Sequence, residues 1–217
     1  MNYYDIHTHR PSINTEDVAI ISVDIRKPFV PCGLWYSMGV HPWYIDFNNK
    51  EMTDQRFEKV REYSLFPSVV AIGETGLDKM TVKTTSDFLF QQKLFTAHAC
   101  LAEEVKKPLI IHCVRAYDDL LHIRQSVQPS MPWIVHGFRG KASLASRLIN
   151  AGLYLSFGQR YNKASLHVAW DNHRLFAETD DSQINIQNVY QLITNDLNIS
   201  LDRLSNEIAE RFKFINR

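Results

Sequence analysis

Short runs of apolar, β-branched and aromatic residues recur along this chain, and a polar or charged residue ends or follows most of them. Each run has the length of a strand that is buried on both faces. The pattern predicts eight strands, which lie at 3–7, 18–24, 34–40, 69–74, 108–113, 133–136, 153–158 and 174–178.

Between the later runs, apolar residues recur at the three-to-four spacing of amphipathic helices. This spacing predicts helices over 53–64, 86–106, 116–125 and 141–151. The tail, 186–217, predicts two more helices, the second with Ser200 as its N-cap. Strands that alternate with helices favour βαβ units and a parallel sheet, and eight such units favour a barrel. We therefore predict an α/β fold, a compact TIM-type (β/α)8 barrel.

The beginning of the chain departs from this pattern. Only about ten residues separate the first run from the second and the second from the third, whereas a helical crossover needs a dozen or more. These connections also contain prolines and show little helical periodicity. We expect the first two crossover helices to be reduced or missing, so that 10–17 and 25–33 are irregular.

Length and charge narrow the class of protein. A chain of 217 residues predicts a single domain over 1–217. Hydrophobic residues make up 45% and charged residues 22%, as in an ordinary globular protein. Lys+Arg and Asp+Glu are equal at 24 each. Proteins that coat duplex DNA usually carry a basic excess, so any contact with nucleic acid is expected to be local.

No targeting or membrane segment is recognisable in the sequence. The first residues, MNYYDIHTHR, contain no apolar signal region, and no apolar run approaches the roughly 18 residues of a membrane helix. Cys32, Cys100 and Cys113 form no C-x-x-C pair, and their odd number argues against a disulfide framework. These features predict a cytoplasmic protein with no membrane partner and no obligate protein partner.

The strongest chemical signal is D-x-H-x-H at 5–9, at the end of the first predicted strand. Alternation along a strand places His7 and His9 on one face, where both imidazoles can bind one ion. Imidazole suits zinc and other borderline divalent metals. A single histidine on a strand is usually a core or surface residue, but two in register after Asp5 favour a metal site.

Further ligand types end other predicted strands. Glu74 ends the run at 69–74 between two glycines, His112 and His136 lie at the ends of their runs, and Asp180 follows the last run. Each alone could be a helix cap or a solvated turn residue. Together with His7 and His9 they come from five strands and lie at carboxyl ends, where a TIM barrel has its active site. We predict that these six residues bind one or two divalent ions.

Candidate substrate contacts lie one step beyond the strands. His41 lies in Gly39-Val40-His41-Pro42-Trp43, and Arg115 follows the run that contains His112. Arginine at a barrel mouth binds phosphate or carboxylate through paired hydrogen bonds. As an exposed helix-start charge, Arg115 would be slightly disfavoured by the helix dipole, which favours a functional role. Arg139 is a weaker candidate of the same kind, whereas His98, His122, His167 and His173 are expected to be structural or surface residues.

The order of these motifs resembles the TatD family of metal-dependent hydrolases over nearly the whole chain. The match consists of D-x-H-x-H at 5–9, G-V-H-P at 39–42, I-G-E-T-G-L-D at 72–78, H-C-V-R-A at 112–116, H-G-F-R-G at 136–140 and E-T-D at 178–180. The resemblance implies a TIM barrel, divalent metals and deoxyribonuclease activity. It implies as metal ligands the set already chosen from the strand ends: His7, His9, Glu74, His112, His136 and Asp180.

Three departures from the family pattern bear on substrate choice. The chain is shorter than the usual member, chiefly in the first two crossovers. Arg10 stands where the family tends to have Leu, and Asp181-Ser182 stands where many members have a small residue and Pro. No ligand position is lost. Because loops after the strands set specificity in this fold, the substrate can differ from that of other members.

The sequence therefore predicts hydrolysis of phosphodiester bonds in DNA, with a single strand or an end as substrate, assisted by one or two divalent ions (Zn, Mg or Mn). Asp180 is expected to be a ligand and the general base, and Glu74 to position a second metal. His41 and Arg115 are expected to hold a phosphate oxygen. Two alternatives stay open. One is hydrolysis of another ester or amide, such as a mischarged aminoacyl-tRNA, and the other is a binding module with a retained barrel.

Overall fold

The computed structural model describes residues 2–12 and 14–213. Their contacts divide the chain into two compact units. The terminal unit consists of Met1–Ile21 and Ile134–Arg217, and the central unit consists of Ser22–Trp133. Each unit carries part of the predicted site.

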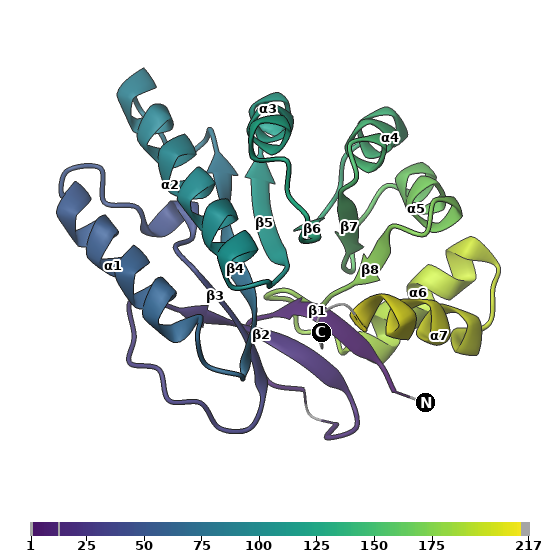
Figure 1. Ribbon diagram of the computed structural model, residues 1–217. Coiled ribbons are helices and arrows are strands. Elements are labelled where there is room, and N and C mark those ends of the chain that lie inside the picture. The colour runs from purple at the N-terminus through teal and green to yellow at the C-terminus, as the bar shows by residue number, and fades with distance from the viewer. Residues whose placement is uncertain (1, 13, 214–217) are drawn as a thin grey trace. The chain divides into compact units, whose positions relative to one another are not determined.

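The strands follow one another in chain order through the sheet, and every described pairing is parallel (Figure 1). Within the terminal unit, the chain after β8 forms a parallel bridge from Asp180 to Thr8 of β1. This is the strand order of a (β/α)8 barrel, so the predicted fold class is confirmed. The strands are β1 Tyr4–Thr8, β2 Val18–Asp24, β3 Trp35–Gly39, β4 Val69–Asp78, β5 Leu109–Val114, β6 Trp133–Val135, β7 Tyr154–Phe157 and β8 Leu175–Ala177.

The helices agree closely with the expected ranges. They are α1 Lys50–Tyr63, α2 Thr85–Glu104, α3 Tyr117–Val127, α4 Ala142–Asn150, α5 Lys163–Asp171, α6 Ile186–Leu197 and α7 Leu201–Phe212. Ser200 is the N-cap of α7, as predicted, and accepts the amide N–H of Arg203. Helix α5 lies outside the expected ranges, because it buries only Ser165, Leu166 and Ala169 and so has a weak apolar stripe.

The described residues of the two short early connections form no crossover helix. In the described residues of 10–17, and throughout 25–33, the backbone forms turns and irregular segments. The prediction for the start of the barrel is therefore confirmed. After β3 the chain forms a single 3-10 turn, η1 (Pro42–Tyr44), before α1 begins.

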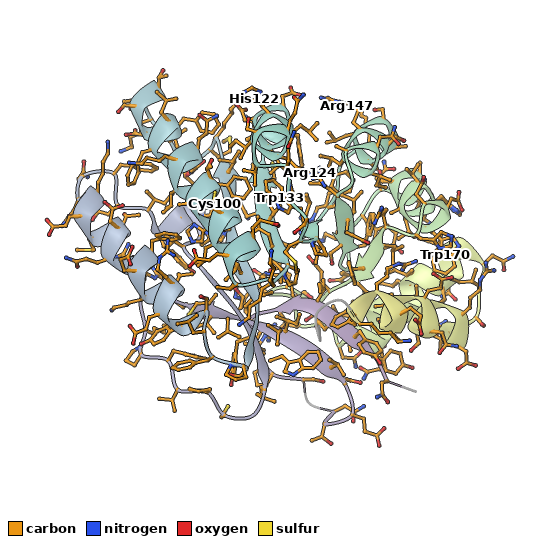
Figure 2. The ribbon with its side chains drawn as sticks, viewed as in Figure 1. Cys100, His122, Arg124, Trp133, Arg147 and Trp170 are labelled. Carbon is orange, nitrogen blue, oxygen red and sulfur yellow. The ribbon has the colours of Figure 1, made fainter. Side chains whose placement is uncertain are left out.

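Each unit contains large apolar side chains that are fully buried. In the central unit, Trp133 and Phe95 are fully buried, and Arg124 of α3 lies over the Trp133 ring with its guanidinium carbon 5.9 Å from the ring centroid (Figure 2). In the terminal unit, Tyr190 and Phe176 are fully buried. No helix within residues 2–12 and 14–213 combines the length and hydrophobicity of a membrane-spanning helix.

Strand β4 extends beyond its predicted end at Glu74 and continues to Asp78, with all ten residues buried. The sequence analysis ended it early because Gly73 and Gly76 resemble a turn. Both glycines instead allow β4 to approach β5 closely. A Cβ atom on Gly76 would lie 1.9 Å from the carbonyl oxygen of His112, and the φ of Gly76 is +152°. Glycine is the residue that accommodates this conformation.

Candidate metal centres

The terminal unit brings together His7, His9, His136 and Asp180, which we call the terminal cluster. The Asp180 carboxylate lies 3.6 Å from Nε2 of His7 and 3.4 Å from Nε2 of His9. The rings of His7 and His136 have centroids 4.3 Å apart. One ligand atom each from His7, His136 and Asp180 lie within 4.8 Å of one another. Four predicted ligands, which lie at or just beyond the carboxyl ends of β1, β6 and β8, are therefore neighbours in the terminal unit.

Asp5 holds the segment after β8 beside β1. Its buried carboxylate accepts the hydroxyl of Thr179 at 2.6 Å and the amide N–H of Thr179 at 3.1 Å. The Thr179 hydroxyl also lies 2.9 Å from the Thr8 hydroxyl. Burial raises the pKa of Asp5 to about 7, against the opposing hydrogen bonds from Thr179. Asp5 is thus a scaffold residue that places Asp180, the next residue after Thr179.

The charge state of Asp180 depends on its histidine neighbours. Burial disfavours the carboxylate, but hydrogen bonds from His7 and His9 and the nearby charge of His136 hold its pKa well below its ordinary value. Asp180 is therefore ionised at neutral pH. An ionised carboxylate beside imidazoles is a typical ligand arrangement for a divalent cation.

A second carboxylate, Glu178, lies behind His136. One of its oxygens accepts the amide N–H of Gly137 at 2.7 Å and lies 3.5 Å from Nδ1 of His136. Glu178 is 1% exposed, and its other oxygen has no hydrogen-bond partner among the described residues. A buried carboxylate oxygen without a donor is costly unless a cation or water satisfies it. The sequence analysis missed Glu178, although its spacing of two from Asp180 was a signal.

A pocket of about 410 Å³ opens beside the terminal cluster. Glu178 and Asp180 line it, together with Arg139 from the loop after β6 and Arg160 from the loop after β7. Both arginines are exposed, and neither has an ion-pair partner in the part of the chain that the structure describes. Asp181 also lines the pocket. Two guanidinium groups beside a candidate metal centre suit an anionic substrate.

The central unit brings together His41, Glu74 and His112, which we call the central cluster. One oxygen of Glu74 lies 2.9 Å from Nε2 of His41 and 3.0 Å from Nδ1 of His112. Ligand atoms of these three residues lie within 4.8 Å of one another. Glu74 is 5% exposed. The two predicted ligands and one predicted substrate contact of this unit are therefore neighbours.

Hydrogen bonding separates the roles of the two histidines. Nδ1 of His41 accepts the amide N–H of Trp43 at 3.0 Å, which leaves the proton of a neutral ring on Nε2. His41 therefore presents an N–H donor toward Glu74 and has no lone pair there for a metal. This supports the predicted role of His41 as a contact to an anionic oxygen.

His112 has the opposite character because Asp78 lies behind it. Nε2 of His112 lies 3.2 Å from the Asp78 carboxylate, and the same oxygen accepts the indole N–H of Trp43 at 2.9 Å. Burial opposes ionisation of Asp78, but hydrogen bonds from Trp43, the Met80 amide and His112 lower its pKa. A carboxylate that accepts the Nε2 proton directs the Nδ1 lone pair of His112 toward Glu74.

Asp78 is a second residue that the sequence analysis missed, although period-two spacing places Glu74, Gly76 and Asp78 on one face of β4. Arg115, the other predicted substrate contact, directly follows β5, is exposed and has a φ of 55°. His98 is fully buried and bound to the main chain, as expected for a structural histidine.

The donor sets suit a divalent metal. Each cluster offers imidazole and carboxylate ligands within the reach of one ion, and Glu178 adds a buried oxygen that lacks a donor. Nitrogen and oxygen donors of this kind bind Zn²⁺, Mn²⁺ and related ions, whereas a thiol-rich site would favour softer metals. The thiols of Cys32, Cys100 and Cys113 are free and belong to neither cluster.

Known proteins resemble this chain in sequence and in fold. YabD of Bacillus subtilis, described as an uncharacterized metal-dependent hydrolase, is 32% identical over 154 residues, which are 68% of this chain and 58% of YabD. The 3'-5' ssDNA/RNA exonuclease TatD of Klebsiella pneumoniae is 30% identical over 125 residues, 57% of this chain and 45% of that protein. The chain thus spans about half the length of the curated relatives it matches.

The solved structure of a TatD family hydrolase from Entamoeba histolytica superposes with a TM-score of 0.76 at 17% identity, over 98% of this chain and 97% of that one. At this identity the match shows a shared fold, which is the TIM-type barrel. The family described as TatD related DNase matches residues 21–213, which include Glu74, His112, His136 and Asp180. This protein therefore belongs to the TatD-related DNase family.

Proposed function

We propose that this protein is a divalent-metal-dependent nuclease that hydrolyses phosphodiester bonds in DNA, with a single strand or a strand end as substrate. The observation that carries the proposal is the terminal cluster, in which His7, His136 and Asp180 offer ligand atoms within 4.8 Å of one another beside a pocket with two arginines. The name of one relative, a 3'-5' ssDNA/RNA exonuclease, supports the choice of substrate.

Within the terminal cluster, His7, His9, His136 and Asp180 would hold an ion. A divalent ion in such a site supplies a Lewis acid that acidifies water and polarises the phosphoryl group. Asp180 stays ionised at neutral pH and lies within 3.6 Å of two imidazoles, so it can act as a ligand and accept the proton of the attacking water. Glu178 supports His136 from behind.

Within the central cluster, Glu74 and His112 would be ligands of a second ion, and Asp78 fixes the orientation of His112. The Nε2–H of His41 would donate to a non-bridging phosphate oxygen, where it stabilises charge that develops in the transition state. Arg115 is exposed directly after β5, where it can also contact a phosphate oxygen.

The substrate strand would be held by few contacts. The chain has no net charge, so binding depends on local cations such as Arg139 and Arg160 rather than on a large basic surface. Local cations suit a short single strand or an end, which presents few phosphates. They do not suit the coating of a long duplex.

The proposal is tested with protein that has been stripped by a chelator and then supplied with Mn²⁺, Mg²⁺ or Zn²⁺. End-labelled single-stranded DNA, duplex DNA, RNA and a mischarged aminoacyl-tRNA form the substrate panel. Hydrolysis of single-stranded DNA should disappear on stripping and return with at least one of the ions. Full activity in excess chelator, or cleavage of the aminoacyl ester alone, would contradict the proposal.

Two variants link this activity to the terminal cluster. His7→Ala should lose both bound metal and hydrolysis, because it removes a buried ligand. His122→Ala is the matched control, since His122 is an exposed histidine on α3 (Figure 2). It should keep the metal content and the activity of the wild type.

A further inference from the structure

Trp43 is an exposed tryptophan in a chain that shields its other three. Trp43 is 65% exposed, whereas Trp133 is buried and Trp35 and Trp170 are half-buried. An indole ring in water forgoes hydrophobic stabilisation, and tryptophan is enriched at the contact surfaces of proteins. Trp43 follows the G-V-H-P motif, and the sequence alone predicts no role for it.

The ring is exposed but held in place. Its Nε1–H donates to the carboxylate of Asp78 at 2.9 Å, and Asp78 is itself buried at 2% exposure. The main-chain N–H of Trp43 donates to Nδ1 of His41 at 3.0 Å, and Pro42 precedes it in η1. A ring that is fixed at both its backbone and its indole nitrogen presents a preorganised aromatic face, at low entropic cost for a ligand.

The ring adjoins the residues proposed to hold the substrate phosphate. Its centroid lies 5.1 Å from that of His41 and 6.0 Å from that of His112, both edge-on. In an edge-to-face pair, one ring presents its edge to the face of the other. The indole therefore lies directly beside the imidazole proposed to bind the phosphate.

A groove of about 520 Å³ runs beside Trp43 and is lined by Arg26, Arg56 and Lys83. Arg26 is ion-paired with Asp24, and Arg56 donates to the carbonyl oxygen of Tyr44.

The groove also contains Asp46 and Asp87, and both carboxylates are engaged by main-chain N–H groups. The described side chains thus combine an exposed aromatic ring with cations. Proteins that bind single strands use this combination, in which bases stack on rings and phosphates follow the cations.

We propose that Trp43 is a stacking platform for one unpaired nucleobase, which lies next to the phosphate bound at His41. This inference rests on the proposed function and narrows its substrate, because a base inside a duplex is already stacked and cannot pack on the ring. Single-stranded nucleic acid with bases present is the class of ligand that Trp43 recognises. The groove cations hold the backbone on the side of η1.

The test measures binding in the presence of a chelator, so that it does not depend on hydrolysis. A series of fluorescein-labelled oligothymidylates carries one abasic residue, moved along the strand position by position. In the wild type, one abasic position should weaken binding by about 5- to 100-fold, the usual loss when one stacked base is removed. In Trp43→Ala the penalty at that position should vanish, whereas Trp43→Phe should retain most of it.

The comparison of Trp43→Ala with Trp43→Phe isolates the contribution of the aromatic ring to binding, because both variants lose the hydrogen bond to Asp78. Phe66→Ala is the matched control, since Phe66 is 37% exposed, stacks on Tyr63 and does not line the groove beside Trp43. It should keep the wild-type penalty. Indole fluorescence should also be quenched by oligothymidylate in the wild type and not in Trp43→Phe.

The proposed stacking on Trp43 would be overturned by either of two results. One is that no abasic position weakens binding to the wild type, and the other is that the abasic residue weakens binding to Trp43→Ala equally. Failure of the proposed function looks different. In that case no metal restores hydrolysis, while the abasic penalty and its dependence on Trp43 persist. Hydrolysis of single strands without any abasic penalty would leave the nuclease proposal intact and reject the role of Trp43.

Discussion

The main-chain N–H of Asp180 donates a hydrogen bond to the carbonyl oxygen of His7 at 3.0 Å. The carbonyl oxygen of Asp180 in turn accepts the N–H of His9 at 3.2 Å. The backbone thus fixes Asp180 between the two histidines, at a φ of 54° that Asp tolerates better than most residues. Because its main chain is anchored, its side chain can be exchanged with little loss of position.

Asp180→Asn therefore tests charge rather than placement. The amide retains the shape but can neither take up a proton nor balance the charge of an ion. If Asp180 is the general base, kcat should fall by about 10²- to 10⁴-fold, with a small change in KM. The measurement is steady-state hydrolysis of single-stranded DNA together with the metal content of the same sample.

Asp171→Asn is the control for this change, because Asp171 is an exposed carboxylate at the end of α5 that belongs to neither cluster and does not line the pocket beside the terminal cluster. It should alter kcat less than threefold, roughly the effect expected of a surface charge. If Asp180→Asn keeps its metal and turns over at the wild-type rate, Asp180 is not the base and Glu74 becomes the candidate.

The pocket beside the terminal cluster predicts a specific effect on binding. Replacing Arg139 and Arg160 by Gln should raise KM for single-stranded DNA more than it lowers kcat, because both would contact phosphates outside the reacting bond. Each lost phosphate contact should reduce the slope of log affinity against log salt by about 0.7 for a single strand. Titration of labelled oligonucleotide at several salt concentrations measures both quantities.

A double variant of equal charge, Arg61→Gln with Arg203→Gln, provides the comparison. These arginines lie on the helices α1 and α7 and do not line the pocket beside the terminal cluster. The control should leave the salt slope unchanged. Equal slopes for the two double variants would show that Arg139 and Arg160 contact no phosphate.

His98 predicts how stability depends on pH. Its Nε2 accepts the N–H of Val40 at 3.0 Å, and its Nδ1 lies 2.8 Å from the carbonyl oxygen of Leu94, so the buried ring is neutral. Burial lowers its pKa from 6.5 to about 4. Below pH 6.5 the unfolded chain therefore binds a proton that the native chain excludes. Stability is complete above that pH and falls as the pH decreases toward 4.

The amplitude of this effect is at most about 3 kcal/mol, from about 1.4 kcal/mol for each pKa unit. His98→Gln removes the titrating group. Its stability deficit relative to the wild type should shrink by about that amount between pH 7 and pH 4, as measured by urea unfolding. A deficit that is the same at both pH values would show that His98 titrates normally in the native protein.

Gly76→Ala should damage the central cluster through the backbone of His112. The added Cβ would lie 1.9 Å from the His112 carbonyl oxygen, so β4 and β5 must separate. Overpacking of this kind usually costs about 1–3 kcal/mol. Urea unfolding should show that the free energy of unfolding falls by an amount at the upper end of this range. The affinity for metal should also fall.

Gly33→Ala is its matched control, because Gly33 also has a positive φ, +79°, but its Cβ would meet no atom within 4 Å. Gly33→Ala should lose only the free energy that a non-glycine residue costs at a positive φ, about 1–2 kcal/mol. A Gly76→Ala protein that is no less stable than Gly33→Ala would show that the two strands have room to separate.

The periodicity of the chain was sufficient to predict the strands, most of the helices and the short early crossovers. Apolar spacing reports which face of an element is buried, and the length of a connection limits whether it can contain a helix. The candidate ligands were predictable for the same reason. Carboxyl ends of parallel strands share one end of the fold, so His7, His136 and Asp180 could be grouped without coordinates.

Only the tertiary structure decided what each side chain does within its cluster. The tautomer of His41 follows from the Trp43 amide, and the orientation of His112 follows from Asp78. The true end of β4 depends on how closely Gly76 approaches β5. Hydrogen-bond donors, tautomers and close approaches are properties of atoms that meet in space. A pattern of apolar and polar positions records burial, and it carries no information about which nitrogen of a ring keeps its proton.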